Sequence, residues 1–261
     1  MSDPVVAFSK SDVIGYITLN RPPANSYEIG FMRDLDAAID AANADSGVKV
    51  VILKSASEKF FSGGADIKAF LANTTAANME MIRTAHRALD KMAASDKVFI
   101  AAINGHAMGG GLELALACAH RIATDHPKTV LALPETQLGL IPGIGGTQRL
   151  PRLIGATKAL EMMLTGESIT PDEALRLGII NRLFPVDKLM EEAEAYARKL
   201  AAGASLAIAR IKQCVYQGIA TNLSDGLALE RKLIEPLFDS EDAKEGLTAF
   251  SEKRPAVYKG R

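Results

Sequence analysis

The sequence predicts an α/β fold, because short apolar runs typical of buried strands alternate with segments of helical periodicity. Residues 48–53 and 98–103 are nearly continuous apolar runs, as expected for strands that are covered on both faces. Apolar side chains recur at helical spacing over residues 29–42, and a second helix is expected over 79–94. For 261 residues, one hydrophobic core with a smaller helical annex is the simplest organisation.

Further strands are expected before and after this alternation. Residues 13–19 contain β-branched and aromatic side chains and end at the break Arg21-Pro22-Pro23, which indicates a strand followed by a loop. After the run at 98–103, a glycine-rich stretch leads into a helix that extends to Cys118. Residues 121–124 and 130–133 are expected to form short strands.

Beyond about residue 155 the strand signals disappear, so the rest is expected to be helical. Thr170-Pro171-Asp172-Glu173 provides an N-cap, a proline at the first helical position and an acidic capping residue, and Gly178 a stop. Ser240 is a good N-cap for the last helix. The remaining helices are expected at 189–200, 204–219, 223–237 and 241–252. We therefore expect a core with the site in residues 1–195 and a helical oligomerisation region in residues 196–261.

Charge and composition exclude several classes of partner. Thirty Lys and Arg residues balance thirty-one Asp and Glu residues without any block of like charge, so we expect neither nucleic-acid nor membrane binding. The four histidines lack the spacing of a metal cluster, and we expect no metal. Two cysteines, Cys118 and Cys214, are too few for a disulfide framework, and no basic and apolar leader is present, so a cytoplasmic location is expected.

Two glutamates lie where other charges are excluded. Glu113 is the only charged residue between Val98 and Ala119, and Glu135 is the only one between Thr129 and Gln148. Burying an ionised carboxylate without a partner is costly, so each needs either a structural ion pair or a chemical task that uses a raised pKa. For a single glutamate the ion pair is the commoner explanation.

Glycine clusters accompany these glutamates. Gly109-Gly110-Gly111 precedes the helix that carries Glu113, so a ligand could approach backbone N–H groups there, although a tight turn alone would also explain the glycines. The segment at 60–68 offers a second such turn, in which Asp66 could be only an N-cap. The glycines at 143–146 do not match a dinucleotide fingerprint. His106 is interpreted as a structural hydrogen-bonding residue.

Three segments together resemble the crotonase, or enoyl-CoA hydratase/isomerase, family. They are residues 61–67 (FSGGADI), 104–114 (NGHAMGGGLEL) and 134–146, which begins Pro134-Glu135 and contains Gly143. The resemblance extends over nearly the whole chain. It implies a spiral of ββα units, followed by a C-terminal helical region that forms trimers or a dimer of trimers.

The resemblance also implies roles for individual residues. The backbone N–H groups of Ala65 and Gly110 correspond to the family's oxyanion hole, and Glu113 and Glu135 to its two catalytic carboxylates. Gly143 corresponds to a backbone donor near the catalytic water. Two fixed N–H donors would stabilise the enolate-like transition state of water addition to a thioester. We assign water activation to Glu113 and proton donation to Glu135, although the pair could share a proton.

The implied substrate is an acyl-CoA thioester, with no separate cofactor. Backbone groups of Gly64, Ala65, Asp66, Ile67 and Gly110 would bind it, with Ala24 in the loop after Arg21. That loop lacks the basic residue that is common in the family. Phe250 and Lys253 match C-terminal positions that in relatives approach CoA, sometimes from an adjacent subunit, although Lys253 could equally be an exposed charge at a helix end.

The presence of both acids favours an enoyl-CoA hydratase over other members of the family. An isomerase can work with one carboxylate, and an enoyl-CoA isomerase or another crotonase-type lyase is the alternative. A relative that binds RNA without catalysis is an alternative of another class, against which the balanced charge argues.

Overall fold

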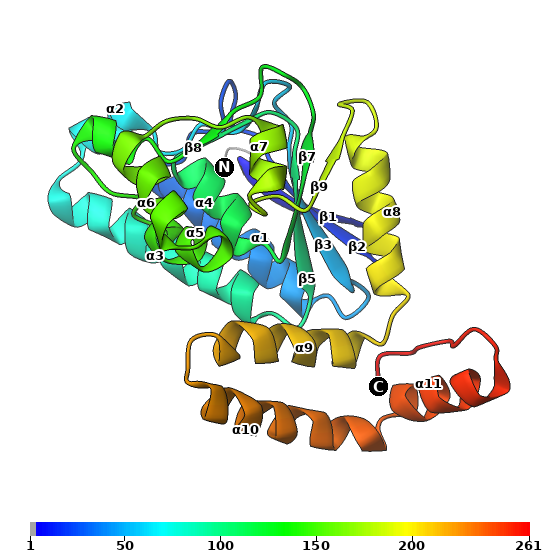
Figure 1. Ribbon diagram of the computed structural model, residues 1–261. Helices are drawn as coiled ribbons and strands as arrows, with labels where there is room; N and C mark the ends of the chain where they lie inside the picture. Colours follow the sequence, from blue (N-terminus) through cyan, green and yellow to red (C-terminus); the bar gives the residue numbers. More distant parts are fainter. Residues whose placement is uncertain (1–3) are drawn as a thin grey trace.

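The computed structural model describes residues 4–261 and confirms the α/β class (Figure 1). A larger sheet has the strand order β1-β2-β3-β5-β7-β9, in which β1 and β2 are antiparallel and the other neighbours are parallel. Its strands are β1 Val6–Ser11, β2 Ile14–Leu19, β3 Val50–Ser55, β5 Val98–Ile103, β7 His120–Thr124 and β9 Arg182–Phe184. A smaller parallel sheet consists of β4 Phe60–Ser62, β6 His106–Met108 and β8 Leu131–Ala132.

The chain builds both sheets together as a repeating ββα unit. Each unit places one strand in the larger sheet, the next strand in the smaller sheet, and then forms a helix. The three units are β3-β4 followed by α2 Ile67–Ala72 and α3 Thr75–Ala94, β5-β6 followed by α4 Gly110–Ala117, and β7-β8 followed by the 3₁₀ helix η1 Glu135–Leu138 and α5 Gly146–Ile154. The loops after β4, β6 and β8 are therefore brought together at one edge.

Alternation along the strands explains why both faces of the larger sheet are buried. Val51 and Leu53 of β3 pack with α1 Ile29–Ala44 and α3, whereas Val50 and Ile52 pack against α8 Leu189–Ala201. Side chains of successive residues point to opposite faces of a strand, so a continuous apolar run serves two layers. Figure 1 shows α8 on the opposite side of the sheet from α1 and α3.

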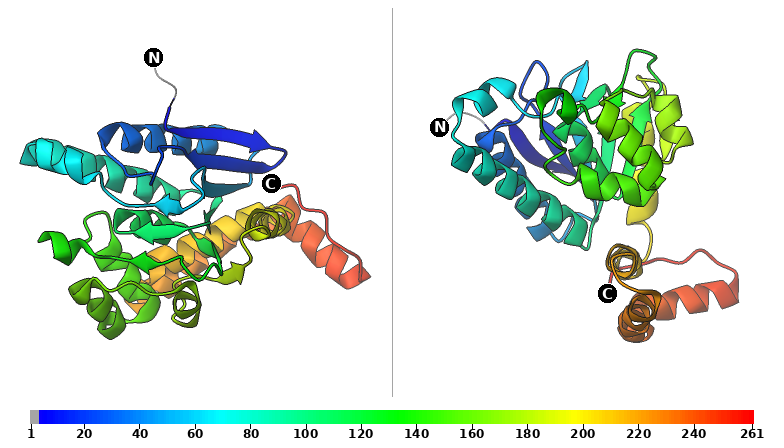
Figure 2. Two further views of the ribbon diagram at one scale, coloured as in Figure 1. Left: turned by 90° about the horizontal axis from the view of Figure 1, so that it is seen from above. Right: turned by 60° about the vertical axis from the view of Figure 1, so that its left-hand side comes forward.

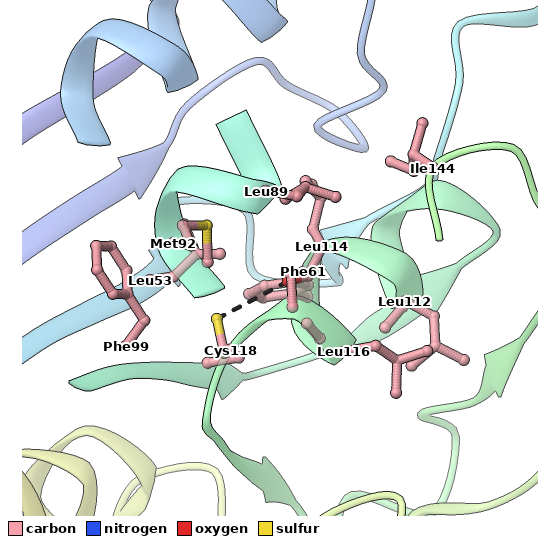
Figure 3. Packing of buried hydrophobic residues seen from close by; sticks show 14 of the residues in the cluster. Leu53, Phe61, Leu89, Met92, Phe99, Leu112, Leu114, Leu116, Cys118 and Ile144 are labelled. Carbon is pink, nitrogen blue, oxygen red and sulfur yellow. Dashed lines mark hydrogen bonds between the residues drawn. The ribbon is translucent and has the colours of Figure 1, made fainter. Parts of the chain in front are cut away.

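The core beneath the loops joins α3, α4 and the smaller sheet. Figure 3 shows Leu89 and Met92 of α3 close to Phe61 and Leu114. Cys118 ends α4, and its Sγ lies 3.8 Å from the carbonyl oxygen of Leu114. Because α4 is buried along its whole length, its first turn is fixed relative to α3.

The expectation that strands end near residue 155 is wrong. Strand β9 pairs with β7, and Ile169 forms an isolated bridge with Leu131. The expected caps are present around α7 Pro171–Arg176: Thr170 accepts a hydrogen bond from the N–H of Glu173, and Gly178 has a φ of +80°. Helix α6 Ala156–Thr165 lies between α5 and α7.

The C-terminal helices stand away from the sheets. They are α9 Ser205–Gly218, α10 Leu223–Ile234, the 3₁₀ helix η2 Glu235–Asp239 and α11 Glu241–Glu252, and Figures 1 and 2 show them as a separate layer. The expected boundary between residues 195 and 196 falls inside α8, whose Ala193, Ala197 and Ala201 pack on the sheet. We therefore place the start of the annex after Ala201. Within residues 4–261 no helix is both long and apolar enough to span a bilayer.

Candidate active site

The loops that follow β4, β6 and β8 enclose a cavity of about 740 Å³. Glu113 and Glu135 both line it, together with Gly64, Ala65 and Gly110. The ββα repeat explains why these loops lie together. Each loop follows the second strand of its unit, and these three strands are neighbours in the smaller sheet. A cavity of this size is typical of a small-molecule site.

Among residues 4–261, the N–H group of Ala65 has no hydrogen-bond acceptor, because the pairing around it uses its neighbours. Tyr27 forms a parallel bridge with Ala65, in which the N–H of Tyr27 donates to the carbonyl of Gly64 and the N–H of Asp66 donates to the carbonyl of Tyr27. This pattern uses the residues on either side of Ala65, so the N–H of Ala65 points away from Tyr27.

Gly110 supplies a second N–H group next to the first. It is the first residue of α4, and the N–H groups of a helix's first turn have no acceptor inside the helix. Gly64, with a φ of +86°, lies so close that a methyl group on it would come within 3.3 Å of the Gly110 nitrogen. The N–H groups of Ala65 and Gly110 therefore lie at the same end of the cavity.

Glu113 is held by backbone groups of a distant loop. Its side chain is 1% exposed, and its Oε1 accepts hydrogen bonds from the N–H of Ile144 at 2.9 Å and of Gly146 at 2.6 Å. Burial, opposed by the two N–H groups and assisted by the charge of Glu135, raises the pKa of Glu113 to about 7. A carboxyl group with this pKa can exchange protons at neutral pH.

Glu135 has a carboxyl oxygen without a hydrogen-bond partner, unlike the Oε1 of Glu113. It begins η1, and its Oε2 is buried without a hydrogen-bond partner among residues 4–261. Desolvation raises its pKa above the ordinary value. Its Oε1 lies beside Gly109, where a methyl group would come within 2.8 Å of it, and Gly109 also has a φ of +54°. Only glycine fits both conditions at this position.

Neither glutamate has the structural ion pair that the sequence left open. Within the described chain no lysine or arginine lies within ion-pairing distance of either carboxyl group, although the charge of Arg149 acts on Glu113 from farther away. Both acids are therefore desolvated groups that face a cavity, which is the arrangement in which a raised pKa serves catalysis.

Tyr27 is a third polar side chain in the cavity, and the charges of the two glutamates contribute to its raised pKa. It is 5% exposed and lines the same cavity, and burial followed by the charges of Glu113 and Glu135 raises its pKa well above the usual value. The phenol therefore stays neutral and keeps its O–H hydrogen. Its ring fills the space that a side chain at Gly110 would need.

A loop of residues 141–146 is fixed by side chains from two helices. His86 of α3 has its Nε2 2.9 Å from the carbonyl oxygen of Gly143, and Arg149 of α5 donates to the carbonyl of Ile144 at 2.9 Å. Asp90, one turn after His86, lies 3.5 Å from the guanidinium of Arg149. The loop that donates to Glu113 is thus anchored at two successive carbonyl groups.

Apolar side chains form the rest of the wall. Phe70, Met79 and Ile82 line the cavity from α2 and α3, and Leu138, Leu140 and Ile141 line it from the segment after Glu135. Leu71, by contrast, points to solvent and is not part of the wall. The cavity can therefore hold an apolar chain next to the two acids.

Most of the residues that the sequence indicated lie together. Ala24, Gly64, Ala65, Ile67, Gly110, Glu113, Glu135 and Gly143 all line the one cavity. The side chain of Asp66 does not line it: its carboxylate caps α2, as the N-cap alternative predicted, and also pairs with Arg21 at 2.9 Å. His106 is structural, since its Nδ1 accepts a hydrogen bond from the N–H of Val130.

Phe250 and Lys253 are not brought to the cavity by their own chain. Phe250 is 88% exposed on α11, and Lys253 ends the same helix with a φ of +55°. Helix α11 lies at the far end of the annex in both views of Figure 2.

Three residues of the site were missed from the sequence. His86 and Arg149 lie in the amphipathic helices α3 and α5, where a polar or charged residue is expected on the exposed face, and Tyr27 lies in the connection before α1. For His86 and Arg149, the available signal was the glycine-rich turn at 143–146, whose carbonyl groups they bind. Among residues 4–261 no group of three or more His, Cys, Asp or Glu side chains could hold a metal ion.

Comparison with known families agrees with this geometry. The family model described as enoyl-CoA hydratase/isomerase matches residues 9–261. A crystal structure of an enoyl-CoA hydratase from Geobacillus kaustophilus is similar over 100% of this chain and 98% of its own, with a TM-score of 0.96 and 43% identity.

Two curated relatives are similar over nearly their whole length. The short-chain-enoyl-CoA hydratase of Clostridium acetobutylicum is 36% identical over 95% of both chains. The crotonyl-CoA hydratase of Syntrophomonas wolfei is 35% identical over 97% of both chains.

Proposed function

This chain belongs to the enoyl-CoA hydratase/isomerase family, and from that premise we propose that it adds water across the 2,3 double bond of trans-2-enoyl-CoA to give 3-hydroxyacyl-CoA. One observation supports this activity more than any other. Two desolvated carboxyl groups, Glu113 and Glu135, line one cavity and have no cation partner in the described chain. Such a pair can both remove a proton from water and deliver one to carbon.

The division of labour between the acids follows from their surroundings. Glu113 accepts two backbone hydrogen bonds, which stabilise its ionised form, so it takes the proton of the attacking water as oxygen bonds to C3. Glu135 has a buried oxygen without a partner, and desolvation disfavours its ionised form, so we assign it proton donation to C2. Because the charge of Glu135 raises the pKa of Glu113, the titrations of the two groups are coupled.

The thioester oxygen would lie against the N–H groups of Ala65 and Gly110. Negative charge develops on this oxygen as water adds, and fixed N–H donors stabilise it without reorganisation. Losing one such donor typically costs roughly 3 to 4 kcal/mol of transition-state stabilisation. The Gly64 carbonyl, which is bound to Tyr27, keeps the first donor in place.

We also propose that the chain assembles into trimers or a dimer of trimers through α9–α11. This annex exposes large apolar side chains that nothing in the described chain covers, among them Ile219, Leu223, Phe238 and Leu247. Exposed apolar surface of this extent is typical of a protein interface. A neighbouring subunit would also be the source of Phe250 and Lys253 for the CoA carrier, since their own chain keeps them away from the cavity.

We further propose a cytoplasmic setting for the enzyme. Cys118 and Cys214 are free thiols, and Cys118 is buried. Free thiols are the normal state of cysteine in a reducing compartment.

The activity is tested by adding the purified protein to crotonyl-CoA and following the absorbance of the conjugated enone. Hydration removes this absorbance and increases the product mass by one water. A series from short to long acyl chains then defines the preferred substrate. If the absorbance is unchanged for every chain length while a 3-enoyl-CoA is converted to the 2-enoyl isomer, the protein is an isomerase and the proposal is wrong.

A further inference from the structure

We propose that His86 is a positioning residue, which stabilises the carboxylate form of Glu113 through the peptide group between Gly143 and Ile144. The proposal deepens the hydratase function and rests on it, since it concerns the group to which we assign water activation. His86 itself need not touch the reacting atoms.

The connection consists of two observed hydrogen bonds that share one peptide group. His86 Nε2 lies 2.9 Å from the carbonyl oxygen of Gly143, and the N–H of Ile144 lies 2.9 Å from Oε1 of Glu113. A carbonyl oxygen can only accept, so Nε2 must carry the hydrogen. The carbonyl of Gly143 and the N–H of Ile144 belong to the same amide. A donor on the carbonyl polarises that amide and strengthens its N–H as a donor.

The loop would not hold this N–H in place by itself. Residues 143, 145 and 146 are glycines, and Gly145 has a φ of +122°, so the backbone has little intrinsic preference for this path. His86 and Arg149 bind the two successive carbonyls, and Asp90 orients Arg149. Through His86 and Asp90, helix α3 therefore helps to orient the N–H of Ile144 towards Glu113.

The other ionisable groups around Glu113 act in known directions. Glu135 from η1 raises its pKa, and Arg149 from α5 lowers it. Tyr27, ahead of α1, is neutral, and Asp90 of α3 is turned towards Arg149. His106 of β6 is engaged with Val130, and β4 contributes no charged side chain. On α3, His86 is linked to Glu113 indirectly: it donates to the carbonyl of Gly143, and the N–H of the same peptide group donates to Glu113.

The test compares three substitutions of His86 in the full-length protein. His86→Phe keeps a ring without a donor, His86→Asn has a donor that is too short to reach Gly143, and His86→Gln has a longer donor. Infrared spectroscopy follows the protonated carboxyl band of Glu113 against pH, with Glu113→Gln as the spectral reference. This titration requires no turnover, so it separates a failure of the proposal from a failure of the hydratase function.

We expect the pKa of Glu113 to rise by about one unit in His86→Phe and His86→Asn, because a stabilising donor is weakened. The acidic limb of kcat/KM for crotonyl-CoA should move to higher pH by the same amount, and His86→Gln should reverse most of both shifts. His126→Gln, in an exposed loop, is the matched control and should change neither. If His86→Phe and His86→Asn lower the rate equally at every pH and leave the Glu113 titration unchanged, His86 has only a structural role and the proposal is wrong.

Discussion

The side chain of Glu113 accepts a hydrogen bond from the N–H of Gly146, which lies 33 residues later in the chain, at 2.6 Å. This contact joins the first turn of α4 to the first residue of α5. It explains how a carboxyl group with almost no solvent contact keeps access to its ionised form. A methyl group on Gly146 would come within 3.1 Å of Glu113 Oε1, so the close approach also requires glycine.

The raised pKa of Glu113 should make the protein less stable as pH rises. Its folded-state pKa of about 7 exceeds the ordinary value of 4.5, so the folded state holds the proton more tightly than the unfolded state. The contribution of Glu113 to the free energy of unfolding, on the order of 3 kcal/mol, is therefore fully present below about pH 4.5 and is lost as pH rises to about 7. Glu113→Gln should reduce this slope, measured by chemical denaturation at fixed protein concentration, while the raised pKa of Glu135 keeps a part of it.

Glu161→Gln serves as the matched control for this measurement. Glu161 is exposed on α6, so its substitution should leave the pH dependence of the wild type in place. An unchanged slope in Glu113→Gln would show that this carboxyl group does not carry the raised pKa.

Gly110→Ala should destabilise the protein because of Tyr27. The added methyl group would overlap the phenol ring and hydroxyl of Tyr27, and overpacking of this kind costs about 1 to 3 kcal/mol. Hydration should fall as well, since the N–H of Gly110 is displaced. Thermal unfolding should show that Tyr27→Leu raises the melting temperature of Gly110→Ala, because the shorter side chain leaves room for the methyl group.

Gly226→Ala is the control for the effect of adding a methyl group. Gly226 lies in α10, where the methyl group would make an ordinary contact at 3.5 Å with Gly218. It should not lower the melting temperature. Strictly additive effects of Tyr27→Leu and Gly110→Ala would argue against direct contact between these two residues.

The annex should mediate self-association. Leu247 is 69% exposed on α11, and Leu247→Glu would place a charge in the proposed interface, where it would lose its hydration. Sedimentation velocity should show trimers or hexamers for the wild type and a shift towards monomers for the variant. Val186→Glu, on an exposed residue between β9 and α8, should sediment as the wild type. A wild-type protein that is monomeric at all concentrations would contradict the proposed assembly.

The sequence predicted those parts of the fold and site that have local signals. Residues 98–103 were expected to form a strand because all are apolar, and β5 has the same bounds. Glu113 and Glu135 attracted attention because each is alone in an apolar stretch, and both line the cavity. Ser240 was expected to cap the last helix, and it accepts a hydrogen bond from the N–H of Ala243.

The remainder depends on contacts between distant parts of the chain. Strand β9 is three residues long, and only its pairing with β7 makes it a strand. His86 and Tyr27 are functional candidates only because the fold places α3 and the start of α1 against the loops of other units. Phe250 could be predicted from the sequence as a family position, but the sequence does not indicate which subunit's cavity this exposed side chain would reach.

The rate of crotonyl-CoA hydration in Glu113→Gln, Glu135→Gln and the double variant tests the central claim most directly. If both acids act on one water, each single substitution should lower kcat/KM by about a hundred- to ten-thousand-fold, with melting temperatures showing a retained fold. The double variant should be little slower than the slower single variant, because groups that act as a unit are not additive. A rate within about tenfold of the wild type in either single variant would contradict the two-carboxylate account.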